Sequence, residues 1–326
     1  MKYFTSTKSK MLLAALTILV IFGAVKSYKY IGRNIASIGF SIFYNKEKIK
    51  AFADADVSIH KPVTCNSKIP GNVWLISYAE GRDLYLANQQ GLVASSINKC
   101  IDFIKIYRKK HIAPEYLEAH KEIFSAKRGA GYWLWKPYLI LETLKTIPEN
   151  DILLYVDSGA TIIKPIDSLL DNLIEKDIAF ADQIFINKNY TRKTLFQIMG
   201  MDYEEAWNSS QANAAFILIK NTQTARDFLA EYLHLAEKPE AIMDSDKSDE
   251  YPEFIDHRHD QSILSLLYLK HKDSIKIIDN GELMQHFFHH RRYGWDGISL
   301  IFNHEPLTRF EAWFSNKAYK ALNSTK

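Results

Sequence analysis

The sequence has few cysteines and little glycine or proline, and these shortages exclude several classes of protein. Its 326 residues include two cysteines, 13 glycines and nine prolines. Two cysteines are too few for a disulfide-rich scaffold or a four-cysteine zinc site. Apolar residues make up 47% and charged residues 24% of the chain, which excludes a disordered or collagen-like protein. Cys65 and Cys100 could pair in an oxidising compartment, and the sequence leaves open whether they lie close together.

Acidic residues are absent from the first 33 residues, which carry six basic ones. The rest of the chain therefore holds 35 basic residues against 38 acidic ones. The net charge of +3 combines +6 at the N-terminus with −3 in residues 34–326. A weakly acidic body does not support binding to nucleic acid, although the total charge alone would suggest it.

A long apolar run is also missing, because the uncharged stretch 11–25 has only fifteen residues. As a helix it would reach roughly 22 Å, which is shorter than the ~30 Å hydrocarbon layer of a bilayer. Flanking lysines can extend towards the headgroups, so we predict a single-pass membrane anchor within residues 1–33, followed by a stem over 34–70. A cleaved signal peptide is the alternative. Three basic residues lie on each side of the run, so the side of the membrane stays open between a Golgi type II and a bacterial inner-membrane protein.

From residue 72 onwards, short apolar runs alternate with helical stretches, which predicts an α/β fold in one domain over residues 71–326. Strands are expected at 73–77, 151–156, 178–181, 214–219 and 275–278. Helices are expected at 87–109, 132–144, 166–173, 222–236 and 259–269, with a polar loop at 237–251.

Asp157 ends one of these apolar strands and is followed by Ser158 and Gly159. Ligands of open α/β sheets bind at the carboxyl ends of the strands. A carboxylate fixed there could bind a hard cation that bridges two phosphates. The alternative is an aspartate that only forms the turn.

The stretch 131–165 resembles the donor-binding segment of GT-A glycosyltransferases, especially glycosyltransferase family eight and its relatives. In that family a Tyr-rich helix with a basic residue leads into an apolar strand that ends in Asp-x-Asp. The resemblance implies that Lys136 lies near the donor and that Asp157 helps to hold Mn²⁺ (or Mg²⁺) on the diphosphate of a sugar nucleotide. Gly159 stands where the family has its second Asp, and one carboxylate alone binds a divalent ion poorly.

Two later segments resemble the same family in the same order. Residues 213–221 resemble its Asn-Ala-Gly strand, which implies that Asn213 lines the sugar pocket, with Ala215 in place of the Gly. Asp260 and Gln261 resemble the Asp-Gln pair that faces the transferred sugar in retaining members. The alternative for Asp260 is a helix N-cap.

A histidine- and arginine-rich stretch, 286–292, follows the last expected strand. The family often has a C-terminal His as a metal ligand, and of His286 and His289 we prefer His289. Arg291 or Arg292 could neutralise phosphate. The stretch 256–260 is a rival metal cluster, but its spacing matches no standard closed site.

Together the resemblance implies a GT-A (Rossmann-like) mixed sheet flanked by helices, preceded by an N-terminal transmembrane helix. It also implies a metal-dependent, retaining glycosyltransferase acting on a glycan, lipid or protein acceptor. An inverting enzyme would need a general base, for which Asp182 is available. A non-catalytic sugar- or nucleotide-binding protein of the same fold is the other alternative. Four aromatic residues could stack on sugars or belong to the core: Tyr132, Trp133, Trp135 and Trp207.

Overall fold

The computed structural model describes residues 57–58, 65–81, 83–96, 99–244 and 246–289. The predicted anchor, most of the predicted stem and Arg291 lie outside these residues. Within the described ranges, no helix has the length and apolar character needed to span a bilayer.

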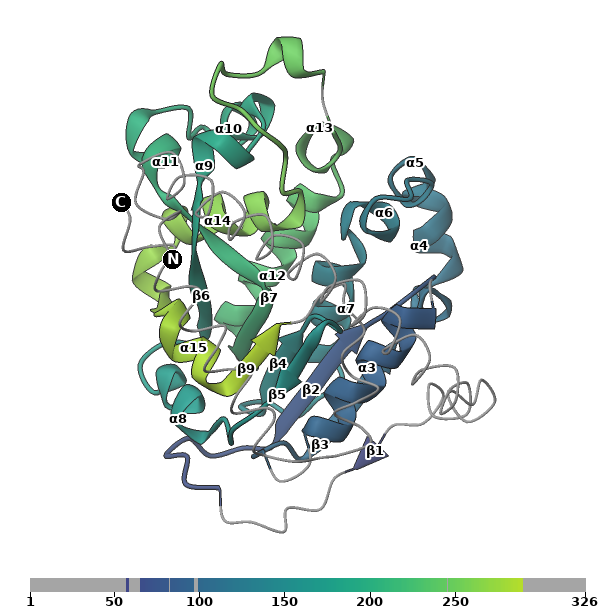
Figure 1. Cartoon of the computed structure of the whole chain (residues 1–326), viewed down its shortest axis with the longest axis vertical. Coiled ribbons are helices and arrows are strands. Elements are labelled where there is room, and N and C mark those ends of the chain that lie inside the picture. The colour runs from purple at the N-terminus through teal and green to yellow at the C-terminus, as the bar shows by residue number, and fades with distance from the viewer. Residues whose placement is uncertain (1–56, 59–64, 82, 97–98, 245, 290–326) are drawn as a thin grey trace, which may run out of the picture.

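A seven-stranded mixed sheet forms the centre of the described chain, in the order β1-β3-β2-β4-β7-β6-β8 (Figure 1). β3, β2 and β4 run parallel to one another, β7 is antiparallel to both β4 and β6, and β6 is parallel to β8. The strands are β1 (Val57–Ser58), β2 (Val73–Tyr78), β3 (Phe103–Tyr107), β4 (Ile152–Val156), β6 (Ile178–Ile186), β7 (Ser210–Lys220) and β8 (Ile275–Ile278). This confirms the predicted mixed sheet.

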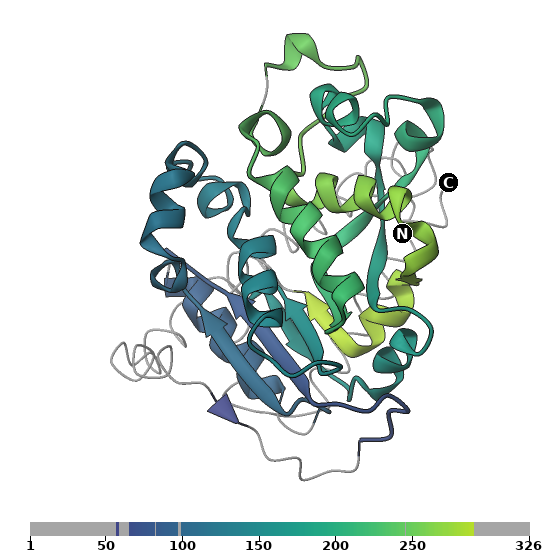
Figure 2. The ribbon, with the colours of Figure 1, turned by 180° about the vertical axis from the view of Figure 1, so that it is seen from behind.

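Helices cover both faces of this sheet, α3 on one face and α7 and α12 on the other (Figures 1 and 2). Side chains along β4 alternate between two apolar clusters, because successive residues of a strand point to opposite faces. The α-helices are α3 (Asp83–Ser95), α4 (Pro114–Ala119), α5 (Lys121–Phe124), α6 (Gly129–Tyr132), α7 (Trp135–Leu144), α8 (Asp167–Leu170), α9 (Asn187–Tyr190), α10 (Lys193–Ile198), α11 (Glu204–Asn208), α12 (Gln223–Ala236), α13 (Pro239–Ile242), α14 (Asp260–Lys270) and α15 (Asn280–His286). Four 3₁₀ turns accompany them: η1 (Lys109–His111), η2 (Asp171–Leu173), η3 (Lys247–Asp249) and η4 (Lys272–Ser274).

The five expected strands all occur, but the expected helix over 87–109 is wrong in its second half. Helix α3 ends at Ser95, and β3 follows at Phe103–Tyr107. The side chains of β3 alternate between half-buried and buried, which is the period of a strand. Cys100 between the two elements has a φ of 64°, a conformation that a continuous helix cannot contain.

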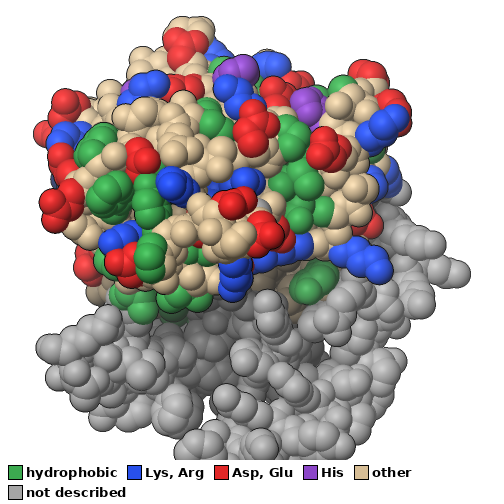
Figure 3. Space-filling model, turned by 90° about the horizontal axis from the view of Figure 1, so that it is seen from above, with side chains coloured by type: hydrophobic (Ala, Val, Ile, Leu, Met, Phe, Trp, Pro, Cys, Tyr) green, Lys and Arg blue, Asp and Glu red, His purple; other side chains and the backbone are tan. Residues whose placement is uncertain are grey.

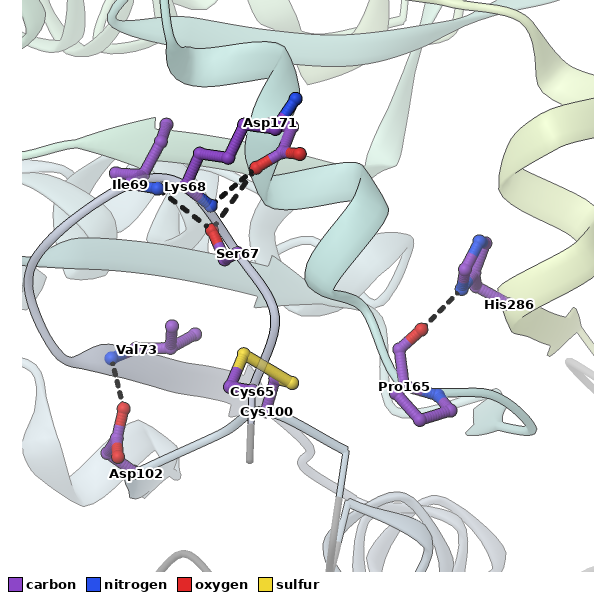
Figure 4. The surroundings of a disulfide bond; sticks show 10 residues. All are labelled: Cys65, Ser67, Lys68, Ile69, Val73, Cys100, Asp102, Pro165, Asp171 and His286. Carbon is purple, nitrogen blue, oxygen red and sulfur yellow. Dashed lines mark hydrogen bonds between the residues drawn. A yellow bond between two sulfur atoms is a disulfide. The ribbon is translucent and has the colours of Figure 1, made fainter. Parts of the chain in front are cut away.

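Cys65 and Cys100 form a disulfide, which answers the question that the sequence left open (Figure 4). It joins the segment before β2 to the loop before β3. Beside it, the backbone N–H of Lys68 donates to Asp171 Oδ1 over 2.9 Å. Residues 65–70, at the end of the predicted stem, therefore contact the folded body.

The sheet order reverses next to β2, because β3 lies on one side of it and β4 on the other. Both neighbours are parallel to β2, so the carboxyl ends of all three strands meet at one edge. Such a switch point is where open α/β sheets bind ligands. Asp157, directly after β4, lies at this edge.

A second, two-stranded sheet follows Asp157 and is formed by β5 (Ala160–Ile162) and β9 (Phe287–His289). The strands are antiparallel, and His289 pairs with Ala160. The last described residues of the chain are thereby brought back to the corner that contains Asp157.

Candidate functional site

Three charged residues from distant parts of the sequence meet at this edge, and we call them the Lys136 cluster: Lys136, Asp157 and Asp260. Lys136 Nζ lies 2.6 Å from Asp260 Oδ2 and 3.6 Å from Asp157 Oδ1, and it donates to the carbonyl of Ala214 over 2.9 Å. The side chains of Lys136 and Asp260 are 3% and 5% exposed, whereas that of Asp157 is 32% exposed. The sequence analysis selected all three residues, and the fold brings them together with only Asp157 open to solvent.

The positions of these residues in their helices explain why the cluster holds together. Lys136 is in the first turn of α7, where the helix dipole disfavours a cation, so nearby carboxylates have to compensate. Asp260 is the first residue of α14, where the dipole favours an anion. The N-cap of α14 is His259, so Asp260 is not the cap. Its carboxylate binds Lys136 instead.

Two buried tyrosines that the sequence analysis missed bind the two aspartates. Tyr155 OH donates to Asp157 Oδ1 over 2.6 Å, and Tyr232 OH donates to the backbone carbonyl of Asp260 over 3.0 Å. Tyr155 could have been identified from the sequence, because its hydroxyl stands in an otherwise apolar strand two residues before Asp157. Tyr232 lies within an ordinary amphipathic helix, so no local pattern points to it.

Burial sets the protonation of the cluster. Burial raises the pKa of Asp260 to about 6, although the ammonium group of Lys136 acts in the opposite direction. Burial disfavours the charge of Lys136, but Asp157 and Asp260 outweigh that effect and raise its pKa above the ordinary value. Burial and the neighbouring carboxylates also raise the pKa of Tyr155 and Tyr232 well above the usual range, which keeps both hydroxyls protonated as donors.

The predicted sugar-pocket residues lie beside the cluster. The backbone N–H of Asp157 donates to the carbonyl of Ala215, so Asn213 of β7 is two residues from the partner of Asp157. Asn213 is buried, and its Oδ1 accepts from the backbone N–H of Ala215 over 3.0 Å. Gly159 is buried in the turn between β4 and β5.

Gln261 is also buried, and its amide is not isolated. Its Nε2 donates to Gln211 Oε1 over 2.8 Å, and Gln211 Nε2 donates in turn to the carbonyl of Tyr190, to Thr191 Oγ1 and to Ser262 Oγ. Gln211 is a further residue that the sequence analysis missed, because nothing in its neighbourhood distinguishes it from other polar residues of a strand end.

Of the two candidate histidines, His286 has both ring nitrogens near other groups. Its Nδ1 donates to the carbonyl of Pro165 over 2.7 Å (Figure 4). Its Nε2 lies 3.2 Å from Ser168 Oγ. His289 is at the other end of β9, opposite Ala160. The register thus places the backbone of His289 beside β5, which begins three residues after Asp157, and the metal-ligand role of His289 stays a prediction.

Metal-binding chemistry at the described residues is limited. No three His, Cys, Asp or Glu side chains in the described part of the chain are close enough together to hold an ion. The rival stretch 256–260 is used otherwise, because His257 Nε2 and His259 Nδ1 donate to the backbone carbonyls of Ala241 and Ile242. Asp157 keeps a partly exposed carboxylate, an oxygen ligand of the kind that Mn²⁺ and Mg²⁺ prefer.

The remaining candidates have other surroundings. Asp182 Oδ1 accepts from the backbone N–H of Asn280 over 3.0 Å, which ties β6 to α15. Trp135 stacks on Tyr78 with 3.9 Å between the ring centroids, so it belongs to the core. Trp207 Nε1 donates to Asp202 Oδ1 on another part of the surface. Seen from above, basic and acidic side chains are interspersed on the described surface (Figure 3).

A left-handed stretch of backbone leads into Lys136, over Gly129–Tyr132 (α6) and Trp133. Five consecutive φ angles are positive, at 58°, 52°, 100°, 49° and 63°. Left-handed conformation costs roughly 1–2 kcal/mol for each residue with a side chain. A Cβ on Gly129 would lie 2.2 Å from the ring of Trp133, so only glycine fits there.

A second set of charges holds this turn, and we call it the Arg128 cluster: Arg128, Asp244 and Asp256. Arg128 Nη1 lies 2.9 Å from Asp244 Oδ1, and Nη2 lies 2.5 Å from Asp256 Oδ2. Tyr132 OH donates to the second oxygen of Asp244 over 3.1 Å. The three charged side chains are 37%, 44% and 42% exposed, so this cluster faces solvent.

Comparisons with known proteins give matches among solved structures. No family model matches the chain, and no curated protein matches it in sequence. It is similar to the apo form of mouse xyloside xylosyltransferase 1, with 12% identity and a TM-score of 0.40, over 64% of this chain and 86% of the other. It is similar to the galactosyltransferase LgtC in complex with donor and acceptor sugar analogues, with 16% identity and a TM-score of 0.37, over 64% and 74%.

The glycosyltransferase GlyE of Streptococcus pneumoniae TIGR4 is similar at 16% identity and a TM-score of 0.34, over 72% of this chain and 50% of the other. All three are named as glycosyltransferases, the class that the sequence motifs resemble. Likeness at this level carries no argument about activity, which has to come from the chemistry of the Lys136 cluster.

Proposed function

We propose that this chain is a glycosyltransferase that moves a sugar from a nucleotide-sugar donor to a hydroxyl of a glycan, lipid or protein acceptor. The observation that carries the proposal is the Lys136 cluster: a buried ammonium group between two carboxylates, at the carboxyl end of β4. It lies at the switch point of the sheet, where a nucleotide would bind. The order of the motifs along the sequence supports the same function.

The charge of the cluster supports a role for a divalent ion. One ammonium group and two carboxylates have a net charge of −1 when all are ionised, and a nucleoside diphosphate adds further negative charge. Additional positive charge is therefore needed before such a donor can bind. Asp157 and His289 would hold Mn²⁺ or Mg²⁺, which when bound would stabilise the diphosphate leaving group. Arg291 would be a further source of positive charge.

The chain's own residues would position the donor and its sugar. Lys136 keeps its charge and would attract the donor, while Asn213 would offer an amide to the sugar hydroxyls. Asp260 and Gln261 would face the anomeric carbon, which corresponds to transfer with retention. Lys136 already holds the Asp260 carboxylate and Tyr232 binds the backbone carbonyl of the same residue, so little reorganisation would be needed as charge develops there.

A binding protein that lacks transferase activity is the second candidate. The observation that favours it is Gly159, which leaves Asp157 as the carboxylate of the turn after β4. Such a protein would bind the donor through the same cluster but would not break the bond between sugar and diphosphate.

For localisation, we propose a single-pass protein anchored through residues 11–25, with the folded domain on an oxidising side of the membrane. The Cys65–Cys100 disulfide supports that side, because structural disulfides are rare in reducing compartments. Labelling of a cysteine added near residue 5 with a membrane-impermeant maleimide tests it. The proposal expects no labelling in sealed vesicles whose domain is accessible from outside.

The enzymatic test uses the purified full-length protein and a panel of sugar nucleotides with Mn²⁺. We expect slow hydrolysis of one donor without acceptor, lost on addition of a chelator and restored by Mn²⁺. Asp157→Ala should lower the rate at least tenfold, whereas Asp227→Ala, which removes an exposed carboxylate from α12, should not. Donor binding without hydrolysis would favour the second candidate, and no binding to any sugar nucleotide would refute both.

A further inference from the structure

His259 has a backbone conformation that residues with side chains rarely adopt. Its φ is 51° and its ψ is −116°. It directly precedes Asp260 and is the N-cap of α14, yet its side chain makes no capping hydrogen bond. A conformation of this kind persists only where the surrounding structure holds it in place.

The contacts of the imidazole ring keep the backbone of His259 in this conformation, and they come from two sides. The ring is 1% exposed, and Nδ1 donates to the backbone carbonyl of Ile242 over 2.7 Å. On the other side, the ring of Tyr132 lies 4.7 Å away, and that of Trp133 is stacked at 5.5 Å with 25° between the planes. Both aromatic residues belong to the left-handed turn that leads into Lys136. One ring therefore contacts the segment before Asp260 and the segment before Lys136.

The ring acts without charge and without reaching solvent. Burial is the main cause that lowers the pKa of His259 to about 4, so the imidazole is neutral at physiological pH. Its Nε2 is buried and, among the described residues, has no hydrogen-bond partner. The nearest acid is Asp244, whose Oδ1 is 3.8 Å away and is already bound to Arg128. A neutral, buried ring with these neighbours is suited to holding adjacent segments in position and not to carrying protons.

We propose that His259 is a positioning residue, which fixes the Asp260 carboxylate on Lys136 through its strained backbone and its ring packed between Ile242 and the left-handed turn. This inference rests on the proposed function in so far as Asp260 faces the donor sugar. The loss of the ring would let the backbone relax to a negative φ, which would turn the first residue of α14 and withdraw Asp260 from Lys136.

His257 provides a matched control two residues earlier. It has the same 1% exposure, and its Nε2 donates to the carbonyl of Ala241, the residue next to Ile242. It differs in having no positive φ and in not preceding Asp260. Its ring also contacts that of His259, with 5.0 Å between the centroids, but the hydrogen bond of His259 to Ile242 and its contacts with Tyr132 and Trp133 do not involve His257. Removal of the His257 ring should therefore loosen the same loop without moving the carboxylate.

Steady-state kinetics with the identified donor provide the first test. We expect His259→Ala to lower kcat at least tenfold with less than a twofold change in the KM of the donor. His259→Asn should recover kcat to within threefold of the wild type, because Asn is among the residues that adopt a positive φ with a negative ψ, as in type II′ turns, and it keeps an N–H donor for Ile242. His257→Ala should lower Tm about as much as His259→Ala and leave kcat unchanged. Equal losses of kcat in the two alanine variants, or wild-type kcat in His259→Ala, would overturn the proposal.

Crystal structures of the two alanine variants provide a readout that does not depend on activity. The distance between Lys136 Nζ and Asp260 Oδ2, 2.6 Å here, should exceed 3.5 Å in His259→Ala and stay below 3 Å in His257→Ala. An unchanged distance in both would overturn the proposal even if the wild type transfers sugar. If the wild type shows no transfer, the distance still tests the positioning role, and only the proposed function fails. Should His259→Ala not fold, His259→Phe keeps the ring without the donor, and wild-type geometry and kcat in that variant would refute the role of the hydrogen bond.

Discussion

The Lys136 cluster and the Arg128 cluster are built from the same parts, one cation and two carboxylates. Each joins the chain around α6 and α7 to the segment that ends at the start of α14. They differ in burial, because the side chain of Lys136 is 3% exposed and that of Arg128 is 37% exposed. The same charges therefore act in a weakly polar interior in one case and in water in the other.

Because the two clusters differ in burial, the pKa values of their paired acids shift in opposite directions. In the Lys136 cluster, burial prevails and raises the pKa of Asp260 to about 6. In the Arg128 cluster, burial is again the largest single cause and acts in the same direction on Asp256, but the hydrogen bond from Arg128 and the nearby positive charges together outweigh it and lower the pKa. An exposed pair thus makes its carboxylate easier to ionise, whereas the buried pair holds a carboxylate that is ready to take up a proton. The first arrangement is that of a structural ion pair, and the second is the one on which the proposed function depends.

The largest expected effect comes from removing the buried cation with Lys136→Met. Donor turnover should fall more than 100-fold, because the two carboxylates would then repel the diphosphate. The free energy of unfolding at pH 8 should fall by about 3 kcal/mol, because Asp260 would be left buried without a partner. Urea denaturation at pH 8 and pH 5 measures this, and the loss should shrink at pH 5, where Asp260 takes up a proton. A loss of the same size at both pH values would contradict the pairing.

The next effect is a pH dependence of stability with opposite signs in the two clusters. The pKa of Asp260 is raised in the folded state, so between pH 4 and pH 6 the folded protein binds more protons than the unfolded one. The free energy of unfolding contributed by this residue should therefore fall by about 3 kcal/mol as the pH rises through that window, since each unit of pKa corresponds to about 1.4 kcal/mol. Asp260→Asn should remove this dependence when its denaturation curves are compared with those of the wild type.

Asp256→Asn is the counterpart for the exposed cluster. The lowered pKa of Asp256 gives stability that is present above about pH 4 and is lost as the pH falls further. The difference between the wild type and Asp256→Asn should therefore be constant from pH 5 to pH 8 and should shrink below pH 4. If the difference in free energy of unfolding between the wild type and Asp256→Asn changes between pH 5 and pH 7, Asp256 titrates like a buried acid, and the predicted contrast between the two clusters is wrong.

A smaller effect is expected from the left-handed turn that connects the clusters. Gly129→Ala should lower the free energy of unfolding by about 2 kcal/mol, because the added Cβ meets the ring of Trp133 and the residue has a φ of 58°. Gly200→Ala is the control, since Gly200 has a φ of 65° but open space around it, and it should lose only about 1 kcal/mol. Thermal unfolding of both variants measures the difference, and equal losses would mean that the contact with Trp133 does not matter.

The sequence predicted the Lys136 cluster better than the Arg128 cluster for a physical reason. Asp157 directly follows an apolar strand, a boundary that periodicity reveals, whereas Lys136 and Asp260 were selected through the resemblance of their segments to a known family. Arg128, Asp244 and the strained backbone of His259 lie in irregular segments, where no periodicity marks which side chains meet. The second half of the expected helix 87–109 failed for a related reason, since β3 has only five residues and so gives a short alternating pattern. The pairing of Cys65 with Cys100 required contacts across the fold, which two isolated cysteines do not indicate.

The smallest expected effect is that of Arg128→Met, and it tests whether exposure limits the Arg128 cluster. Surface ion pairs contribute about 1 kcal/mol or less, so the free energy of unfolding should fall by about that much at low salt. Because salt screens exposed charges and not buried ones, the loss should become smaller in 0.5 M NaCl, whereas the loss in Lys136→Met should not. Donor KM should stay within twofold of the wild type, since Arg128 is not in contact with Lys136, Asp157 or Asp260. Urea denaturation at both salt concentrations measures the stability. If the loss in Arg128→Met is as large as that in Lys136→Met and equally independent of salt, the exposed cluster behaves like a buried one and the comparison fails.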